Sequence, residues 1–444
     1  MNDSRLSTAE TLALLEQVIA HAKQRGVSAA EAAISSGGGL SVSVRNGELE
    51  SIEHHQDKVL TLSTYHGKRK GTATTTDFSA ASIAETAAAA DRIARHAEED
   101  PYAGLIEARY LATDIPDLDL DHPWGLEPDA AIELATRCDT AAREFGNGVD
   151  QVDDVSVNQH RGLRGYATSD GFAGAYTASR HGLSCVVVGK DNGNMQRGYW
   201  YTAARDPHQL EAPEPVGHRA AERTVAKLGA RKTATEKVPV IFEAPIAGGL
   251  IGHLVSAVSG GNLYRSASFL LDSAGKQIFP ERMTISERPH RACGIGSAPF
   301  DGEGAATADR ELVDHGVLTG YVLESYAARR LDLPPTGNAG GVHNLSVSHE
   351  DVDFDGLLRE MGRGLLVTDL MGFGVNMVTG DYSRGASGFW VEGGEIAYPV
   401  EEITIAGNLA DMFMQIAVVA NDIDTRGNIQ SGSILLESMT VAGE

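Results

Sequence analysis

The sequence predicts an α+β protein: antiparallel sheets with flanking helices form an N-terminal α+β region, and a glycine-rich, mainly-β C-terminal domain follows. Three observations lead to this prediction. Segments with helical spacing of apolar residues alternate with segments in which apolar residues occupy every second position. Short turn signals such as Asn46-Gly47 join neighbouring strand-like segments, which is typical of antiparallel hairpins. The 50 glycines outnumber the 15 prolines, which indicates many tight turns rather than disorder.

The expected first domain, residues 1–110, consists of two helices and two hairpins. Leu12, Leu15 and Val18 lie on one face of the first helix, and Gly26 ends it. Asp77 or Ser79 can cap the second helix. In chain order the expected elements are the helix 8–25, the strands 41–45 and 48–54, the strands 59–65 and 69–75 around His66-Gly67, and the helix 80–96.

The expected second region, residues 111–235, combines a linker with a middle α+β domain. The acidic stretch 99–121 contains Pro101 and Pro116, so we expect it to be a linker or an extended segment on the surface. Turns are expected at Asp170-Gly171 and at 191–193. The other expected elements are the helix 128–144, the strands 152–160, 163–169, 174–180, 184–189 and 196–202, and the helix 213–228.

The expected third domain, residues 236–444, begins with a short apolar strand at 238–242. Leu250, Leu254 and Val258 recur every four residues after it, which predicts a helix with one apolar face. Gly260-Gly261 end this helix. Further hairpin turns are expected at His315-Gly316 and at Gly393-Gly394, although neither half of the chain contains a dinucleotide or phosphate-binding fingerprint.

Charge and cysteine content restrict the class of protein. The net charge of -24, without any basic run, argues against a nucleic-acid-binding surface, because phosphate contacts need clustered Lys and Arg. Cys138, Cys185 and Cys293 are odd in number and far apart, which fits free thiols in a reducing compartment. The start of the chain does not have the pattern of a signal peptide, and no apolar run reaches membrane-spanning length. We therefore expect a soluble, cytoplasmic protein that binds neither membrane nor DNA.

The helix after residue 244 is where some peptidases carry two zinc-binding histidines, and this one carries only His253. Its partners one turn away are Gly249 and Ala257, neither of which binds a metal. No glutamate occurs between Glu243 and Glu281, so the base that would activate a metal-bound water is absent as well. We expect His253 to be a structural histidine that hydrogen-bonds a neighbour.

No local pattern elsewhere predicts a metal site. The 15 histidines include no pair three or four residues apart. The carboxylates of the C-terminal half show no ligand spacing and are expected to be solvated or to cap turns; they include Asp301, Glu303, Asp381, Glu401 and Glu402. A site assembled from distant residues stays open at this point.

Many short phrases, in one order along the chain, resemble the TldD/TldE metallopeptidase family, and in particular its PmbA/TldE branch. The phrases are VSV at 42–44 with GE at 47–48, KGTATTTD at 70–77, GHL at 252–254 with GG at 260–261, FLLDS at 269–273, GKQI at 275–278, PFDGEG at 299–304, SYAAR at 325–329, TGNAGG at 336–341, GDYSRG at 380–385, GFWV at 388–391, PVEEITIAGN at 399–408 and NDI at 421–423. The resemblance covers the whole chain and implies that residues 236–444 form the peptidase-like domain.

The resemblance also implies where this chain departs from the catalytic, TldD type of the family. That type carries a His-Glu-x-x-x-His zinc helix and a later cysteine ligand. The two histidines fall on Gly252 and Ala257, the glutamate falls on His253, and the cysteine falls near Arg426. The implied role is a subunit with no catalytic residue, no metal ligand and no cofactor of its own, which completes a peptidase with a TldD-type partner that holds the zinc.

The same resemblance implies the partners and substrates. A heterodimer or larger complex with the TldD-type subunit is expected, and a homodimer is possible for the isolated chain. The expected substrates are unfolded peptides, as in maturation of microcin-type precursors or degradation of antitoxin. The family name "modulator of DNA gyrase" reflects an indirect link to DNA. Two alternatives stay open: an autonomous metallopeptidase with an unconventional site, and a scaffold or binding protein without a role in proteolysis.

A polar segment bracketed by glycines, 380–385, is the expected source of substrate contacts. Glycine lets the backbone of such a loop approach another chain closely, and the planar guanidinium of Arg384 suits a carboxylate or a peptide carbonyl. The candidates for a substrate groove are Asp381, Tyr382, Arg384 and Trp390. The alternative is a turn in which Arg384 pairs with a local acid such as Asp381.

Overall fold

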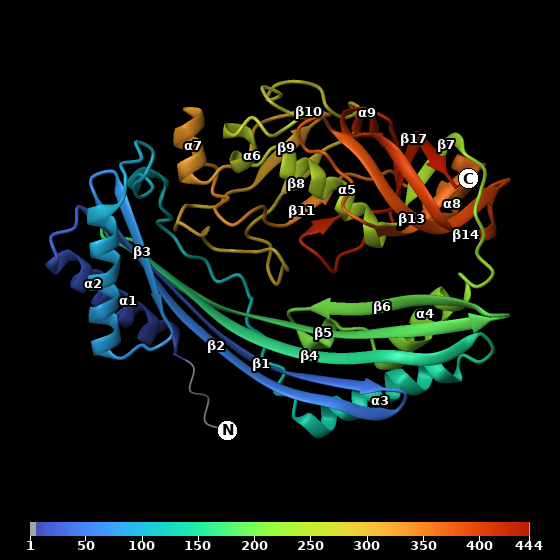
Figure 1. Cartoon of the computed structure of the whole chain (residues 1–444), viewed down its shortest axis with the longest axis horizontal. Coiled ribbons are helices and arrows are strands. Elements are labelled where there is room, and N and C mark those ends of the chain that lie inside the picture. Colours follow the sequence, from blue (N-terminus) through green and yellow to red (C-terminus); the bar gives the residue numbers. More distant parts are fainter. Residues whose placement is uncertain (1–5, 444) are drawn as a thin grey trace.

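The computed structural model describes residues 6–443 and has the predicted α+β fold. The N-terminal half contains one long antiparallel sheet of order β3-β2-β1-β4-β5-β6. Figure 1 shows this sheet as a curved band, with the C-terminal half on its inner side. The strands are β1 (Ala29–Arg45), β2 (Glu48–His66), β3 (Arg69–Thr75), β4 (Val149–Thr168), β5 (Ala173–Asp191) and β6 (Asn194–Ala204).

Four helices cover one face of this sheet: α1 (Thr8–Gln24), α2 (Ala80–His96), α3 (Pro128–Glu144) and α4 (Pro213–Val225). Because side chains alternate along a strand, the even-numbered residues of β1 all point to this face. Ile34 packs there with Leu15 of α1, and Val42 packs with Ala135 of α3. The opposite face is therefore left for the C-terminal half.

The long strands correct our expectation of shorter ones, since 48–54 and 59–65 belong to β2 and the four segments 152–189 belong to only two strands, β4 and β5. Near the expected break at 161–162, small residues lie opposite one another on neighbouring strands: Gly37 pairs with Gly162, and Gly162 pairs with Ala178. A Cβ added to the nearby Gly39 would lie 2.0 Å from the Gln159 carbonyl oxygen. The glycines therefore allow close backbone approach within a continuous, curved sheet.

The segment between α2 and α3 is extended and largely exposed, as expected, but a few of its apolar side chains are buried. It contains one short 3-10 helix, η1 (Ala108–Tyr110). Leu118 and Leu120 are buried. The Ser179 amide of β5 donates to the Leu120 carbonyl, and the Cys293 amide of the C-terminal half donates to the Leu118 carbonyl. Near Leu118 and Leu120 the segment is thus bound to both the sheet and the C-terminal half.

The C-terminal half is built from two sheets and short helices. The larger sheet has the order β14-β13-β12-β7-β17-β15, and β14 also pairs with β17, which closes it into a barrel. The smaller sheet has the order β10-β9-β8-β11-β16. Two pairings are parallel, β7 with β12 and β11 with β16, and the others are antiparallel.

The bounds of these elements follow the chain. They are β7 (Glu236–Phe242), α5 (Ala244–Ala257), α6 (Gly260–Tyr264), β8 (Ile285–Glu287), β9 (Arg310–Asp314), β10 (Val317–Leu318), α7 (Ser325–Leu331), β11 (Leu345–Val347), α8 (Phe354–Met361), β12 (Gly364–Met371), β13 (Asp381–Glu392), β14 (Glu395–Asn408), α9 (Leu409–Met414), β15 (Ile416–Val419), β16 (Ile429–Gln430) and β17 (Ile434–Ala442). Helix α5 contributes Leu250, Ile251 and Leu254 to the main core of this half.

The three-part division expected at 110 and 235 stays a prediction, and the strands of the first two parts share one sheet. Within residues 6–443, no helix combines the length and the apolar character needed to cross a membrane.

Candidate functional site

Helix α5 is held at its N-terminal end by contacts with two other elements. Glu243 precedes the helix and accepts two hydrogen bonds of 2.6 Å from the Arg223 guanidinium of α4. The Ala244 amide donates to the hydroxyl of Ser433, the residue before β17. Pro245 stands in the first turn, where a missing N–H removes no helical hydrogen bond. The position of α5 is therefore set by both halves of the chain.

Of the two places that the resemblance assigns to zinc-ligand histidines, packing fills the one at Ala257, and the one at Gly252 is partly open. A Cβ added to Gly252 would lie 4.0 Å from Ile429 Cδ1, and one added to Gly248 would lie 3.2 Å from the Ile429 carbonyl oxygen. This glycine face lets α5 lie close to β16. Ala257 is 0% exposed and belongs to the core. Neither position contributes a group that could bind a metal.

Arg426 stands where the resemblance places the ligand cysteine, and it joins the C-terminal half to the first sheet. Its guanidinium donates to both carboxylate oxygens of Asp424, at 2.9 and 2.7 Å, and to the Tyr201 carbonyl of β6 at 2.8 Å. The guanidinium carbon also lies 4.1 Å from the centroid of the Trp200 ring. Since Ile429 follows three residues later, the structure brings this segment and α5 together, with a cation instead of a thiol.

His253 makes an aromatic contact, which differs from the hydrogen bond that we expected. Its ring meets the Tyr382 ring edge to face, with centroids 5.8 Å apart. Among the described residues, no hydrogen bond of the imidazole is found. Burial, and then the positive charge of Arg384, lower the pKa of His253. The imidazole is therefore neutral at neutral pH and has no second ligand beside it.

The segment 380–385 is the beginning of strand β13 rather than a polar loop. Asp381 pairs with Asn408 and Arg384 pairs with Ile405 of β14. Gly380 has a φ of 79°, so the sharp turn lies just before the strand. We missed this strand because the glycines suggested a turn, whereas only Gly380 has a left-handed backbone.

The four groove candidates do not line one wall. Tyr382 and Arg384 lie on the same face of β13, toward His253. Arg384 donates to the Gly372 carbonyl and does not pair with Asp381, whose carboxylate instead accepts from Thr379 and Asn408. Tyr382 and Trp390 are 2% and 1% exposed and pack in the core, which corrects the assignment of both as substrate contacts.

Three family models match consecutive parts of the chain. They describe the PmbA/TldA metallopeptidase domain 1 at residues 30–94, the central domain at 121–228 and the C-terminal domain at 235–443. The chain is 50% identical to "Metalloprotease PmbA" of Escherichia coli O157:H7, over 94% of this chain and 92% of that protein. The chain belongs to the PmbA/TldE metallopeptidase family. A second relative, "Metalloprotease PmbA homolog" of Haemophilus influenzae, is 46% identical over 93% of this chain and 92% of its own length.

Solved structures of similar proteins agree with this family fold. A crystal structure from Bacteroides thetaiotaomicron, named as a candidate modulator of DNA gyrase, is 26% identical, covers 97% of this chain and 98% of its own, and gives a TM-score of 0.93. TldE from Thermococcus kodakarensis shares the fold, with a TM-score of 0.85, 22% identity and coverage of 97% of this chain and 100% of its own.

A cavity between the first sheet and the C-terminal half of this PmbA/TldE chain was not predicted. Its volume is about 360 Å³, and its lining includes Arg164, Arg180, Phe300 and His343. Neither Arg164 nor Arg180 forms an ion pair with any carboxylate of residues 6–443. The same lining contains the buried carboxylate of Asp301, so the cavity carries charged groups of both signs.

The structure also brings together three side chains that the search for histidine pairs missed: Asp119, His122 and Cys293. The spacing of Asp119 and His122, three residues apart, was the only local signal. Cys293 could not be connected with them from the sequence, because 171 residues separate it from His122.

Proposed function

We propose that this chain is the non-catalytic subunit of a peptidase of the PmbA/TldE family, in which a TldD-type partner holds the catalytic zinc. One observation carries the proposal. Helix α5 and the segment 426–430 lie side by side, as a metal site built from them requires, yet Gly252, Ala257 and Arg426 stand where the three ligands would be. The two backbone segments are in place, but the side chains that would bind the metal are absent from them.

The remaining groups around α5 cannot replace that chemistry. Zinc hydrolases use three protein ligands, an open position for water and a base that takes the proton of the water. Near α5 this chain offers one neutral imidazole, His253, and the cation Arg384. A cation repels a metal ion and lowers the proton affinity of its neighbours, so the place suits packing or contact with a peptide more than metal hydrolysis.

Exposed apolar residues support the presence of a partner. The connection between β12 and β13 exposes Phe373 completely and also exposes Val378, and Met371 at the end of β12 is exposed beside it. Large apolar groups gathered on one exposed segment are typical of protein interfaces. We assign this segment to the contact with the TldD-type subunit, and a second copy of the chain can occupy it when that subunit is absent.

Unfolded peptides are the proposed substrates, and the cytoplasm is the proposed location. Arg384 keeps guanidinium N–H groups beyond its bond to Gly372, so it can donate to a carbonyl of an extended peptide. Asp381 is exposed and remains proposed as a neighbour of that peptide. All three cysteines are free thiols, which supports a reducing compartment.

The test is to purify this chain and a TldD-type subunit separately and then to mix them. Light scattering follows association, and cleavage of an unfolded peptide follows activity. We expect a stable complex at micromolar concentration, and hydrolysis that requires both subunits and is abolished by a chelator.

Three results distinguish the alternatives. Hydrolysis by this chain alone would indicate an autonomous metallopeptidase. Association without any gain in hydrolysis would indicate a scaffold. A TldD-type subunit that cleaves as fast alone as in the mixture would contradict the proposal.

A further inference from the structure

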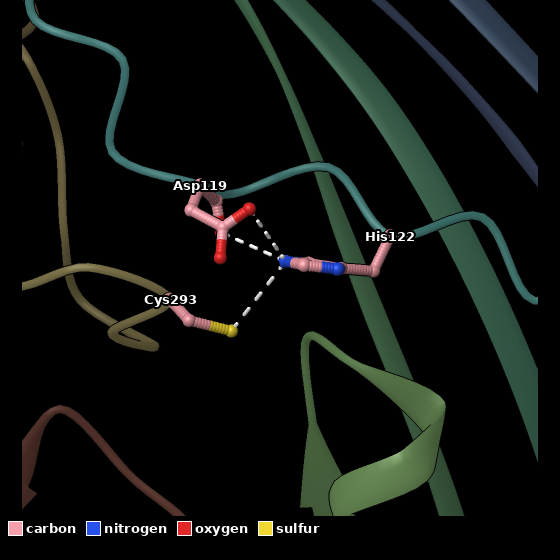
Figure 2. A group of neighbouring side chains, drawn as sticks. All are labelled: Asp119, His122 and Cys293. Atoms are coloured by element: carbon pink, nitrogen blue, oxygen red, sulfur yellow. Dashed lines mark hydrogen bonds and ion pairs between the residues drawn. The ribbon is translucent and has the colours of Figure 1, made fainter.

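A second place in the molecule, remote from α5 in sequence, has the composition of a metal site. Asp119 and His122 belong to the extended segment between α2 and α3, and Cys293 belongs to a loop of the C-terminal half. Figure 2 shows the three side chains converging, with the imidazole between the carboxylate and the thiol. One ligand atom from each residue lies within 4.8 Å of the others.

The distances match those of ligands around one tetrahedral ion. Zn–N and Zn–O bonds of about 2.05 Å and a Zn–S bond of about 2.3 Å place tetrahedral neighbours about 3.4 Å (N to O) and about 3.6 Å (N to S) apart. His122 Nε2 is 3.3 Å from Asp119 Oδ1 and 3.7 Å from Cys293 Sγ. An ion can therefore be accommodated with little movement of these two contacts.

Backbone hydrogen bonds hold the segments that carry the three residues. The Cys293 amide donates to the Leu118 carbonyl at 2.8 Å, which ties the loop to the residue before Asp119. The His122 amide donates to the Ser179 hydroxyl of β5 at 2.8 Å. Outer partners of this kind orient the ligands of a metal site before the metal binds.

The backbone at two of the three residues is strained. Asp119 has a φ of 55° and Cys293 has a φ of 54°. Residues other than glycine rarely adopt this left-handed conformation, although aspartate does so more often than most. Such a conformation is often found at binding sites.

The alternative to metal binding is that these three side chains only form hydrogen bonds with their neighbours. The Asp119 carbonyl oxygen lies 2.9 Å from His122 Nε2, so the ring can donate its proton there when no ion is present. A bound ion replaces that proton on Nε2. The thiol gains a weak contact from the 3.7 Å approach to His122 and a hydrogen bond with the Asp206 backbone, and a bound ion would compete with both.

From this geometry we propose that Asp119, His122 and Cys293 bind one divalent d-block cation, with zinc as the first candidate. A thiolate and an imidazole select such ions and exclude calcium and magnesium, which prefer oxygen ligands. Water completes the coordination, and the 68% exposure of the Asp119 side chain leaves a path for entry.

This site is separate from the proposed peptidase function and does not depend on it. With this site, the expectation that the chain binds no metal applies only to the region around helix α5. Because its ligands come from the inter-helix segment and from the C-terminal half, a bound ion would join the two parts beside β5. The expected consequence is a metal-dependent gain in stability, since the unfolded chain does not hold these residues together.

Cobalt(II) titration of the isolated chain, purified without a histidine tag and stripped with a chelator, tests the proposal. We expect one equivalent to bind with a near-ultraviolet thiolate-to-cobalt absorption band, and zinc to displace it. Cys293→Ser should abolish the band. His122→Ala should weaken binding by at least about 100-fold, more than the loss of an outer partner usually brings. The matched control is His315→Ala, which removes an exposed imidazole elsewhere.

Two results would overturn the site. The first is wild-type protein that binds no cobalt at micromolar concentration, or binds it without the thiolate band. The second is equal affinity in wild type and the His122→Ala variant. If a variant fails to fold, the band of the wild-type protein alone decides the question. Differential scanning calorimetry with and without zinc then measures whether the ion stabilises the chain.

Discussion

At the scale of single residues, His253 stands where the sequence resemblance places a catalytic glutamate, and here its ring is used for packing. Its ring contacts Tyr382, whose own pKa is raised to about 12 by burial. Both rings are therefore uncharged near neutral pH. A neutral aromatic pair needs no counter-charge, which suits an α5 without acidic side chains after Glu243.

The lowered pKa of His253 predicts a pH-dependent contribution to stability. An unfolded histidine binds a proton near pH 6.5, and the folded one binds it only at lower pH. As pH falls below about 6.5 the unfolded state therefore gains protons first, and the contribution of His253 is lost. His253→Phe keeps the ring contact and cannot titrate.

We expect the unfolding free energy of His253→Phe to rise relative to wild type between pH 7.5 and pH 5.5, by at most about 1.4 kcal/mol per pH unit. Urea unfolding at both pH values measures it. His315→Phe, at an exposed position, is the control and should show no such trend. Parallel pH profiles for wild type and His253→Phe would show that this histidine does not couple folding to protonation.

Single residues also mark what the sequence can and cannot predict. Gly252 and Ala257 exclude a helical zinc pair by identity alone, without any coordinates. The contact of His253 with Tyr382 and the approach of Cys293 to His122 could not be predicted, because each joins residues more than 100 positions apart. Local spacing carries no information on such pairs.

At the scale of elements, the hairpin turns were predicted and the strand lengths were not. Asn46-Gly47, His315-Gly316 and Gly393-Gly394 all have positive φ at both residues, which the sequence signal requires. The expected strands ended at 54 and began again at 59, yet the backbone of β2 stays extended between them because β1 pairs with it throughout. Pairing with a distant strand decides strand length, whereas turn chemistry is local.

At this scale we predict how stability changes when histidines are placed in helix α5 at the two positions that the resemblance assigns to zinc ligands. Ala257→His puts an imidazole into a fully buried position and should lower the unfolding free energy by about 1–3 kcal/mol through overpacking. Gly252→His should change it by less than about 1 kcal/mol, because the position is partly open and glycine is a poor helix former.

Urea unfolding of the two variants measures this difference. Gly249→Ala is the control, since a Cβ there meets nothing within 4 Å, and it should be neutral or stabilising. Equal stability of Ala257→His and Gly252→His would mean that α5 has room for a histidine at both positions. That result would contradict our explanation that packing fills the position of Ala257.

At the scale of the whole molecule, the two halves are joined by polar contacts around a shared interior. Arg223 of α4 binds Glu243 before α5, Arg426 binds the Tyr201 carbonyl of β6, and Gln196 binds Glu401. These contacts hold the C-terminal half on the inner side of the curved sheet (Figure 1). The exposed connection between β12 and β13 lies outside this interior and is free to meet a partner.

The last prediction concerns that connection. Phe373 is completely exposed, an unusual state for a large aromatic side chain, and aromatic residues dominate the binding energy of protein interfaces. Phe373→Asp should weaken binding of a TldD-type subunit by about 2 kcal/mol or more, roughly thirtyfold in Kd, and leave folding intact. Titration calorimetry measures the Kd, and circular dichroism verifies the fold.

Leu49→Asp, at another exposed apolar residue, is the control and should bind normally. If Phe373→Asp binds the partner as wild type does, the interface lies elsewhere; if the variant abolishes only self-association, the segment serves a second copy of the chain.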